Sequence, residues 1–282
     1  MKGKVRKFNF MARTLDDDVV KDGLESISVL NGKEPYFLVG GVASQSYLPT
    51  KCRRPTSDID FALVRPLSKP DFRIMITPVR EYLHDMGYKT IPKISNRSRS
   101  FALYLLKLHD EGEDSLCLEF MRKNEANFKK HKDRLEREYN NTREKIVEER
   151  KTTYRVSSPE DIAVPKLVRL INSIQRNPKF IQQIPPKLES LSDEIIEKRI
   201  EMINSIRSEA VSNPGDPYLA ERLRFISDIY DIRILSELTG FNPEYFNRAE
   251  QDWHDIKENQ ELRERIFLAT LPISFGKTKE SK

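Results

Sequence analysis

Two short stretches decide the fold: LVGGVAS at residues 38–44 and RPTSDIDF at residues 54–61. Side chains two apart in a strand lie on the same face, so Asp58 and Asp60 point one way and Ile59 and Phe61 the other. Two neighbouring carboxylates repel each other and need a cation to stay ionised together. Hard oxygen ligands of this kind suit Mg²⁺ or Mn²⁺, which also bind nucleotide phosphates.

The diglycine at Gly40 and Gly41 comes between a short apolar run and a segment that can form a helix. Glycine lets the backbone approach a ligand closely. If a helix opens at Val42, its free N–H groups provide a cradle for phosphate. The order of these signals is more informative than any one of them.

The first 120 residues alternate between helical and strand patterns. Helices are predicted over residues 15–34, 42–48 and 78–86, and the loop at 51–55 is basic and marked by proline. Strands are predicted at residues 36–39, 58–64, 100–107 and 115–121. This alternation indicates a sheet with helices packed on it.

The pattern changes after residue 121. Residues 122–151 hold 11 Lys and Arg against 7 Asp and Glu. They favour a solvated helix with charge pairs over a basic surface for a phosphate backbone. Beyond residue 155 the sequence pattern predicts only helices. We therefore predict an α+β protein, with a mixed-sheet core over residues 1–150, a helical domain over 151–276 and a disordered tail over 277–282.

Composition excludes several classes of protein. The 282 residues are 38% hydrophobic and 33% charged, with a net charge of +5, which suits a soluble globular chain. Two cysteines are too few for a disulfide framework or a cysteine zinc site, and the four histidines lack metal-ligand spacing. No apolar run approaches the ~20 residues of a membrane span, and no signal peptide is recognisable. We expect a cytoplasmic protein without a membrane partner.

The order strand, Gly-Gly, short helix, basic loop and Ser-Asp-x-Asp resembles the nucleotidyltransferase superfamily, which includes DNA polymerase β and the tRNA CCA-adding enzymes. That resemblance implies a DNA polymerase β-like fold with a third carboxylate on a later strand. The matching residue is Glu119, in the segment LCLEF at residues 116–120. Many relatives have aspartate there.

Two helical segments narrow the resemblance to the AbiEii-type toxin nucleotidyltransferases: SPEDIAVPKLVRL at residues 158–170 and SDIYDIRIL at residues 227–235. The resemblance implies that Lys166 contacts nucleotide phosphates and that Asp228 completes the site, with Asp231 as the less favoured alternative. If these residues belong to no nucleotide site, Lys166 would extend from a helix face into solvent and Asp228 would pair with Arg224 on the same helix. Asp231 has no basic residue three or four positions away, which indicates a solvated carboxylate.

The family chemistry requires two divalent ions, Mg²⁺ or Mn²⁺, and an NTP. Asp58 and Asp60 would bind both ions and Glu119 the ion nearest the acceptor, whose hydroxyl attacks the α-phosphorus and releases pyrophosphate. The triphosphate would be held by the set Gly40, Gly41, Ser57 and Lys166. Arg53 and Arg54 would meet phosphate or RNA.

The sequence thus predicts a metal-dependent nucleotidyltransferase that transfers NMP to an acceptor hydroxyl. The AbiEii-type resemblance implies the toxin of a toxin–antitoxin system, an RNA or tRNA 3′ end as acceptor, and an antitoxin as protein partner. Two alternatives stay open: a small-molecule nucleotidyltransferase of the antibiotic-modifying kind, and a non-catalytic nucleotide- or RNA-binding module with the same fold.

Overall fold

The computed structural model describes residues 12–94, 100–110, 112–121, 124–188 and 190–272. It divides the chain into two compact units, one formed by Met1–Ser46 with Pro55–Ser158 and the other by Tyr47–Arg54 with Pro159–Lys282. The boundary therefore differs from the predicted one at residue 150, because the strand Thr152–Val156 pairs with Tyr36–Val39 in the first unit. The predicted disordered tail, residues 277–282, lies outside the described residues.

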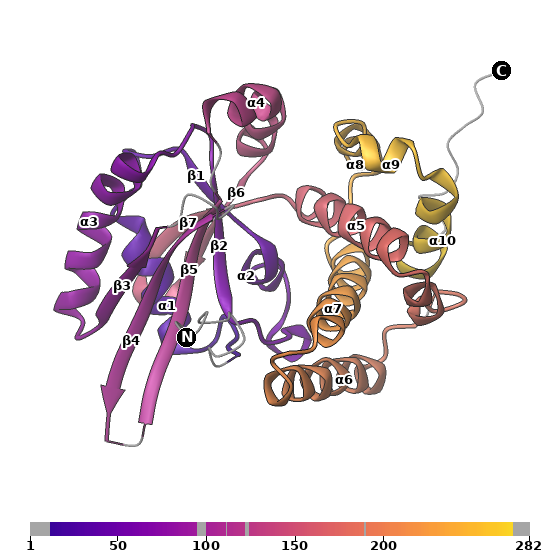
Figure 1. Ribbon diagram of the computed structural model, residues 1–282, viewed down its shortest axis with the longest axis horizontal. Helices are drawn as coiled ribbons and strands as arrows, with labels where there is room; N and C mark the ends of the chain where they lie inside the picture. The colour runs from indigo at the N-terminus through magenta and orange to yellow at the C-terminus, as the bar shows by residue number, and fades with distance from the viewer. Residues whose placement is uncertain (1–11, 95–99, 111, 122–123, 189, 273–282) are drawn as a thin grey trace. The chain divides into compact units, whose positions relative to one another are not determined.

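Within its described residues the first unit forms a seven-stranded sheet in the order β3-β4-β5-β2-β1-β7-β6 (Figure 1). The β1–β7 and β2–β5 pairs are parallel and the other neighbours antiparallel, so the sheet is mixed. The strands are β1 (Tyr36–Val39), β2 (Asp58–Leu63), β3 (Lys89–Lys93), β4 (Ser100–His109), β5 (Gly112–Met121), β6 (Arg143–Val147) and β7 (Thr152–Val156).

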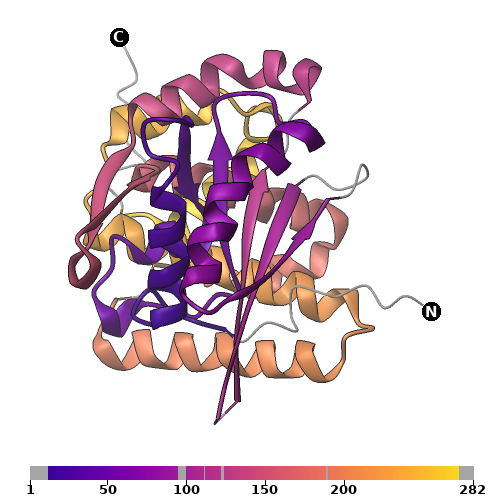
Figure 2. The same ribbon diagram turned by 90° about the vertical axis from the view of Figure 1, so that its left-hand side faces the viewer.

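One face of this sheet is covered by α1 (Asp18–Ser28) and α3 (Lys69–Asp85), which lie side by side (Figure 2). Phe61 of β2 stacks on Phe120 of β5 at 5.2 Å between ring centroids, and Phe72 of α3 packs against Phe120 at 5.5 Å. All three rings are fully buried. The apolar half of the β2 alternation therefore faces the core under α1 and α3, as its period of two predicts.

The opposite face carries α4 (Glu125–Asn140) and the short α2 (Gly40–Gln45). Leu135 of α4 packs in one buried cluster with Phe37 of β1 and Ala62 of β2. Ala62 is two residues after Asp60, so α4 covers the part of this face that follows the Asp58 and Asp60 positions.

The second unit consists of helices. Phe180 stacks on Phe225 of α7 at 4.8 Å, and Phe246 of α8 packs against Phe267 of α10 at 5.6 Å. The helices of the second unit are η2 (Thr50–Cys52), α5 (Pro159–Arg176), η4 (Pro178–Gln183), α6 (Asp193–Ser212), α7 (Pro217–Leu238), α8 (Pro243–Glu250), α9 (His254–Lys257) and α10 (Gln260–Thr270). None of the helices in the described ranges combines the length and apolarity that crossing a membrane requires.

The predicted α+β class, a mixed sheet followed by helices, is confirmed. The prediction of one solvated helix over residues 122–151 was wrong in its second half. That segment contains α4, then the edge strand β6 and the turn η3 (Glu148–Arg150). Arg143 and Glu144 are exposed in β6 and Lys145 is half-buried, so this edge strand lacks the apolar alternation that marks a strand in the sequence.

Candidate metal and nucleotide site

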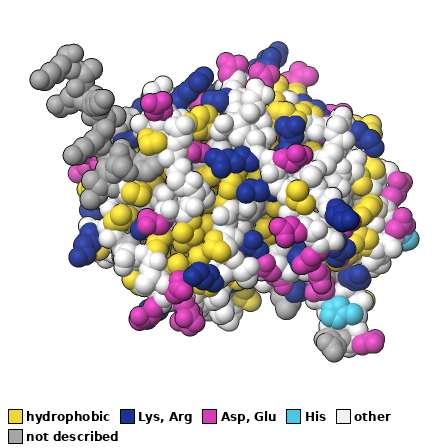
Figure 3. Space-filling model, turned by 180° about the vertical axis from the view of Figure 1, so that it is seen from behind, with side chains coloured by type: hydrophobic (Ala, Val, Ile, Leu, Met, Phe, Trp, Pro, Cys, Tyr) yellow, Lys and Arg dark blue, Asp and Glu magenta, His cyan; other side chains and the backbone are white. Residues whose placement is uncertain are grey.

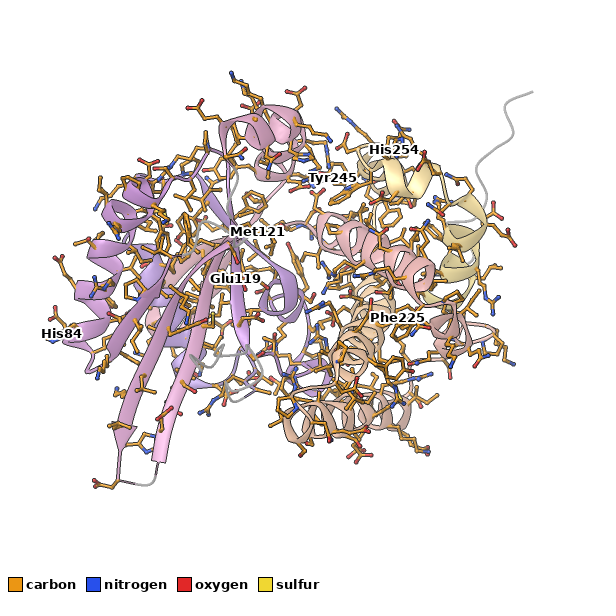
Figure 4. All side chains as sticks on the ribbon, viewed as in Figure 1. His84, Glu119, Met121, Phe225, Tyr245 and His254 are labelled. Atoms are coloured by element: carbon orange, nitrogen blue, oxygen red, sulfur yellow. The ribbon has the colours of Figure 1, made fainter. Side chains whose placement is uncertain are left out.

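Three carboxylates meet on the sheet face opposite α1 and α3. In the parallel β2–β5 pair, Asp60 lies directly across from Glu119, and Asp58 lies across from Cys117. One carboxylate oxygen from each of Asp58, Asp60 and Glu119 falls within 4.8 Å of the others, and all three residues are half-buried. Figure 4 labels Glu119 on the sheet. Glu119 stands on β5, between β4 and β2, so it is not on an edge strand. We call these three residues the carboxylate triad.

Gly40 lies next to the triad, and both its backbone conformation and its lack of a Cβ are required there. Its φ of +79° lies in the left-handed region, and a Cβ added there would come within 2.3 Å of Asp60 Oδ2. The antiparallel β1–β2 register, which places Val39 across from Asp60, brings the diglycine to this position. Only glycine leaves room for the Asp60 carboxylate.

Replacing Gly40 by alanine is expected to displace the Asp60 carboxylate and to weaken Mn²⁺ binding about tenfold or more. Gly32→Ala is a matched control, because Gly32 has a similar φ of +73° but open space where its Cβ would lie. Both variants should lose about 1 kcal/mol of stability through backbone strain. Titration calorimetry with Mn²⁺ and urea unfolding measure the two effects; equal Mn²⁺ affinity in the two variants would contradict this role of Gly40.

Thr56 orients Asp58, the triad residue farther from Gly40 along β2. Its hydroxyl donates to Asp58 Oδ1 at 3.2 Å, and a Cβ on Gly41 would come within 3.0 Å of Thr56 Oγ1. Ser57, predicted as a nucleotide contact, is buried immediately before Asp58. The two glycines thus pack against Asp60 and against the residue that orients Asp58.

Ser100 at the start of β4 donates a hydrogen bond to Glu119 Oε1. Sequence reasoning did not find this residue. It lies 19 positions before Glu119, and only the antiparallel β4–β5 pairing, in which Ala102 faces Glu119, brings the two together. Such contacts fix the orientation of a metal-binding carboxylate.

Ser100→Ala should therefore weaken Mn²⁺ binding roughly tenfold while the fold is kept, because the Glu119 carboxylate loses the donor that orients it. Ser28→Ala, which removes a hydroxyl bonded only locally to the Glu25 carbonyl in α1, serves as control. Calorimetric Mn²⁺ titration of both variants checks this, and an unchanged affinity in Ser100→Ala would rule out the orienting role.

The triad fits a divalent cation. Its donors are three carboxylates, the hard oxygen ligands that Mg²⁺ and Mn²⁺ prefer. Within 4.8 Å of one another, the three negative charges repel strongly unless a cation or protons neutralise them. The arrangement is therefore suited to bind a metal ion, and Asp58, Asp60 and Glu119 are the residues that could hold it.

The helical unit holds a second cluster of charges, around Lys166. Lys166 Nζ donates to Asp231 Oδ2 at 2.6 Å and lies 3.5 Å from Asp228 Oδ1. Arg169 makes two hydrogen bonds of 2.8 Å to Asp228. Arg54 binds Asp231 through Nε at 2.8 Å and Nη2 at 2.5 Å. We call these five residues the Lys166 cluster.

This cluster corrects the expectation that Asp231 is solvated. Asp231 and Lys166 are 1% and 2% exposed, so both are buried. Burial raises the pKa of the Asp231 carboxyl, but the charges and hydrogen bonds of Arg54 and Lys166 outweigh it and hold the pKa below its ordinary value. Asp228 pairs with Arg169 and Lys166 rather than locally with Arg224.

The sequence-predicted residues thus fall into two groups. Asp58, Asp60 and Glu119 converge in the first unit, beside Gly40. Lys166 and Asp228 meet in the second unit, with Asp231 as the closer partner of the lysine. Arg53, also in the second unit, donates from Nε to the Leu48 carbonyl at 2.9 Å.

No protein-family model matches the chain, and a search of curated proteins finds no match. Among solved structures, an antigenic nucleotidyltransferase-like protein from Paracoccidioides brasiliensis is similar at 9% identity and a TM-score of 0.41, covering 94% of this chain and 99% of its own. A putative nucleotidyltransferase from Helicobacter pylori has 12% identity and a TM-score of 0.34, covering 84% of this chain and 96% of its own. JHP933 from Helicobacter pylori has the same identity and TM-score, covering 86% and 95%.

Proposed function

We propose that this protein is a metal-dependent nucleotidyltransferase that transfers NMP from an NTP to an acceptor hydroxyl and releases pyrophosphate. One observation carries the proposal: the carboxylate triad lies against a glycine whose Cβ would collide with Asp60. A simple acidic surface does not require such a glycine. A diglycine backbone beside a cation site is suited to hold a nucleotide triphosphate.

Each residue has a role in this proposal. Asp58, Asp60 and Glu119 would hold two Mg²⁺ or Mn²⁺ ions, whose charge would stabilise the phosphates and favour ionisation of the attacking hydroxyl. Gly40, Gly41 and Ser57 hold the triphosphate through backbone and hydroxyl donors. Glu119, oriented by Ser100, accepts the proton of the acceptor hydroxyl. Thr56 keeps Asp58 in its binding orientation.

We assign Lys166 and Asp228 to the same reaction, with Asp231 as a positioning residue. The Lys166 cluster contains three basic and two acidic side chains and so carries one net positive charge. A net positive charge favours a phosphate group nearby. The bond to Asp231 fixes the direction of the Lys166 ammonium group.

An RNA 3′ end, such as that of a tRNA, is the acceptor we favour. α4 packs on the triad face of the sheet through Leu135 and exposes Lys129, Lys130 and Lys132. On the face that Figure 3 shows, Lys and Arg are interspersed with Asp and Glu. Exposed lysines beside the site would bind phosphates of an RNA strand. In this proposal the protein is the toxin of a cytoplasmic toxin–antitoxin pair, and an antitoxin is its protein partner.

Incubation with Mg²⁺, each α-labelled NTP in turn and total RNA tests the proposal. The wild type should transfer label to RNA, and Asp58→Ala/Asp60→Ala should not. Asp193→Ala, which removes an exposed carboxylate of the helical unit, is the control and should label normally. Equal labelling by the wild type and the double variant would refute the proposal.

The salt dependence of the transfer separates the RNA acceptor from a small molecule. Affinity for an acceptor bound through its phosphates falls steeply as salt rises, whereas binding of a small acceptor in a pocket changes little. A non-catalytic module would bind NTP but release no pyrophosphate, which a colorimetric phosphate assay with added pyrophosphatase measures.

A further inference from the structure

The triad face of the sheet continues from the carboxylates across β4 and β3, where several of its side chains are apolar. In the antiparallel β4–β5 pair, Ala102 lies across from Glu119 and Tyr104 lies across from Cys117. β3 continues this row, with Ile91 across from Tyr104. Because directly paired residues point to the same side of a sheet, Tyr104 and Ile91 share the face of Glu119.

These apolar side chains are accessible to solvent. Ile91 is 47% exposed, and Met121, two residues after Glu119 on β5, is 41% exposed (Figure 4). Tyr104 is half-buried. A sheet face in contact with water usually carries polar side chains, so apolar side chains gathered there indicate a binding surface. We call Ile91, Tyr104 and Met121 the apolar platform.

Positive charge flanks the apolar platform. Lys89 and Lys93 are exposed on β3, two positions to either side of Ile91, and so lie on the same face. Lys93 Nζ lies 5.8 Å from the centroid of the Tyr104 ring. A cation over an aromatic ring at an exposed site is weakly held, so this ammonium group can move to a phosphate. Basic side chains beside an aromatic ring are the combination that binds single-stranded nucleic acid.

The spacing between Tyr104 and the triad fits a single nucleotide. Tyr104 and Glu119 are diagonal neighbours in the β4–β5 pair, and the Cα atoms of such neighbours are about 7–8 Å apart. In a nucleotide only the ribose separates the base from the 3′ hydroxyl. A base that lies on the Tyr104 ring therefore brings its own 3′ hydroxyl close to Glu119.

We propose that the apolar platform binds the terminal base of a single-stranded RNA 3′ end, with the base stacked on Tyr104 and the preceding phosphate beside Lys93. This inference rests on the proposed function, because the 3′ hydroxyl of the stacked nucleotide is the acceptor near Glu119. Every base has an aromatic face, so the platform recognises a free 3′ end rather than a sequence.

Two single-stranded RNAs of about eight nucleotides test the stacking without any transfer. Both carry fluorescein at the 5′ end, and one ends in adenosine while the other ends in an abasic ribose. Fluorescence anisotropy with Mg²⁺ and without NTP measures the affinities. The wild type should bind the abasic RNA about tenfold more weakly, the effect of losing one stacked base. Tyr104→Ala should bind both RNAs with this lower affinity, because the base then has no ring to stack on.

Two further variants separate stacking from a structural effect. Tyr104→Phe keeps the ring and should bind both RNAs as the wild type does. Tyr218→Ala removes an exposed ring from α7 in the helical unit and should leave both affinities unchanged. Mn²⁺ titration calorimetry on Tyr104→Ala should give the affinity of the wild type, which verifies that the triad is intact. In the labelling assay Tyr104→Ala should raise KM for RNA about tenfold and keep kcat.

Equal binding of the two RNAs by the wild type, or no binding of either, would overturn the proposal. A Tyr104→Ala variant that still distinguished the two RNAs as the wild type does would also overturn it. These outcomes do not depend on nucleotidyl transfer. Stacking of the 3′ end on Tyr104 in a protein that transfers no label would support the binding surface and refute the proposed function.

Discussion

Asp60→Asn is expected to lower nucleotidyl transfer about a thousandfold or more while leaving the fold intact. Asparagine keeps the shape of the side chain but removes the negative charge from the centre of the triad, directly across from Glu119. Loss of one well-placed electrostatic group at a reacting centre typically costs 10²–10³ in rate, and Asp60 is assigned to both ions. Labelled transfer, with Mn²⁺ titration calorimetry on the same sample, measures the effect.

Although Asp60→Asn should lower the transfer rate, it is expected to keep or increase the stability of the metal-free fold. Without metal, three carboxylates within 4.8 Å repel one another, so removing one charge should leave the urea midpoint equal or higher. Added Mn²⁺ should raise the midpoint of the wild type but not that of Asp60→Asn, because only a species that binds metal is stabilised by it.

Asp85→Asn is the control for Asp60→Asn. Asp85 is the last residue of α3, on the sheet face opposite the triad, and its side chain is 86% exposed. It should leave both transfer and the Mn²⁺ effect unchanged. If Asp60→Asn lost stability without metal and still responded to Mn²⁺, the triad would be a structural cluster rather than a metal site.

Two of the three triad positions could be predicted from local signals in the sequence. Alternation within β2 places Asp58 and Asp60 on one face, whereas Glu119 was predicted from the resemblance to nucleotidyltransferases, and the apolar residues on either side of it fit a central strand. A short helix follows β1, as predicted, but it begins at Gly40 rather than at Val42. The alternation in β2 and the diglycine are recognised from neighbours within a few residues.

The supporting contacts could not be predicted, because they depend on pairing across the fold. Ser100 reaches Glu119 only through the β4–β5 register. Arg54 meets Asp231 across 177 positions of sequence, and no local pattern reports such a contact. The AbiEii-type resemblance favoured Asp228 over Asp231, yet Lys166 lies closer to Asp231.

Asp231 and Lys166, the two most deeply buried of these charges, are thus held by partners from distant segments. Asp231 accepts from both Arg54 and Lys166, and all three are 9% exposed or less at the side chain. Once such an ion pair is formed, removal of one partner is far more costly than its net contribution to stability, because the remaining charges stay buried without compensation. This asymmetry makes Asp231 the most sensitive position of the cluster.

Asp231→Asn is expected to destabilise the helical unit by about 3 kcal/mol or more at neutral pH, since Arg54 and Lys166 lose the buried charge between them. Trp253, the one tryptophan in the sequence, belongs to this unit, so its fluorescence during urea unfolding reports the effect. Asp193→Asn is the matched control: it removes a carboxylate from the exposed pair with Lys51 in the same unit and should hardly move the transition.

The pH dependence provides an independent check on Asp231. Its pKa is lowered in the folded state, whereas the unfolded carboxyl has a pKa of about 3.9. The unfolded chain therefore binds more protons as the pH falls through that range, and the stabilisation by Asp231 is complete above about pH 5 and lost progressively below pH 4. The difference in unfolding free energy between the wild type and Asp231→Asn should be constant from pH 5 to 8 and shrink at lower pH. A difference that persisted unchanged below pH 4 would show that shape, rather than charge, is what Asp231 contributes to the cluster.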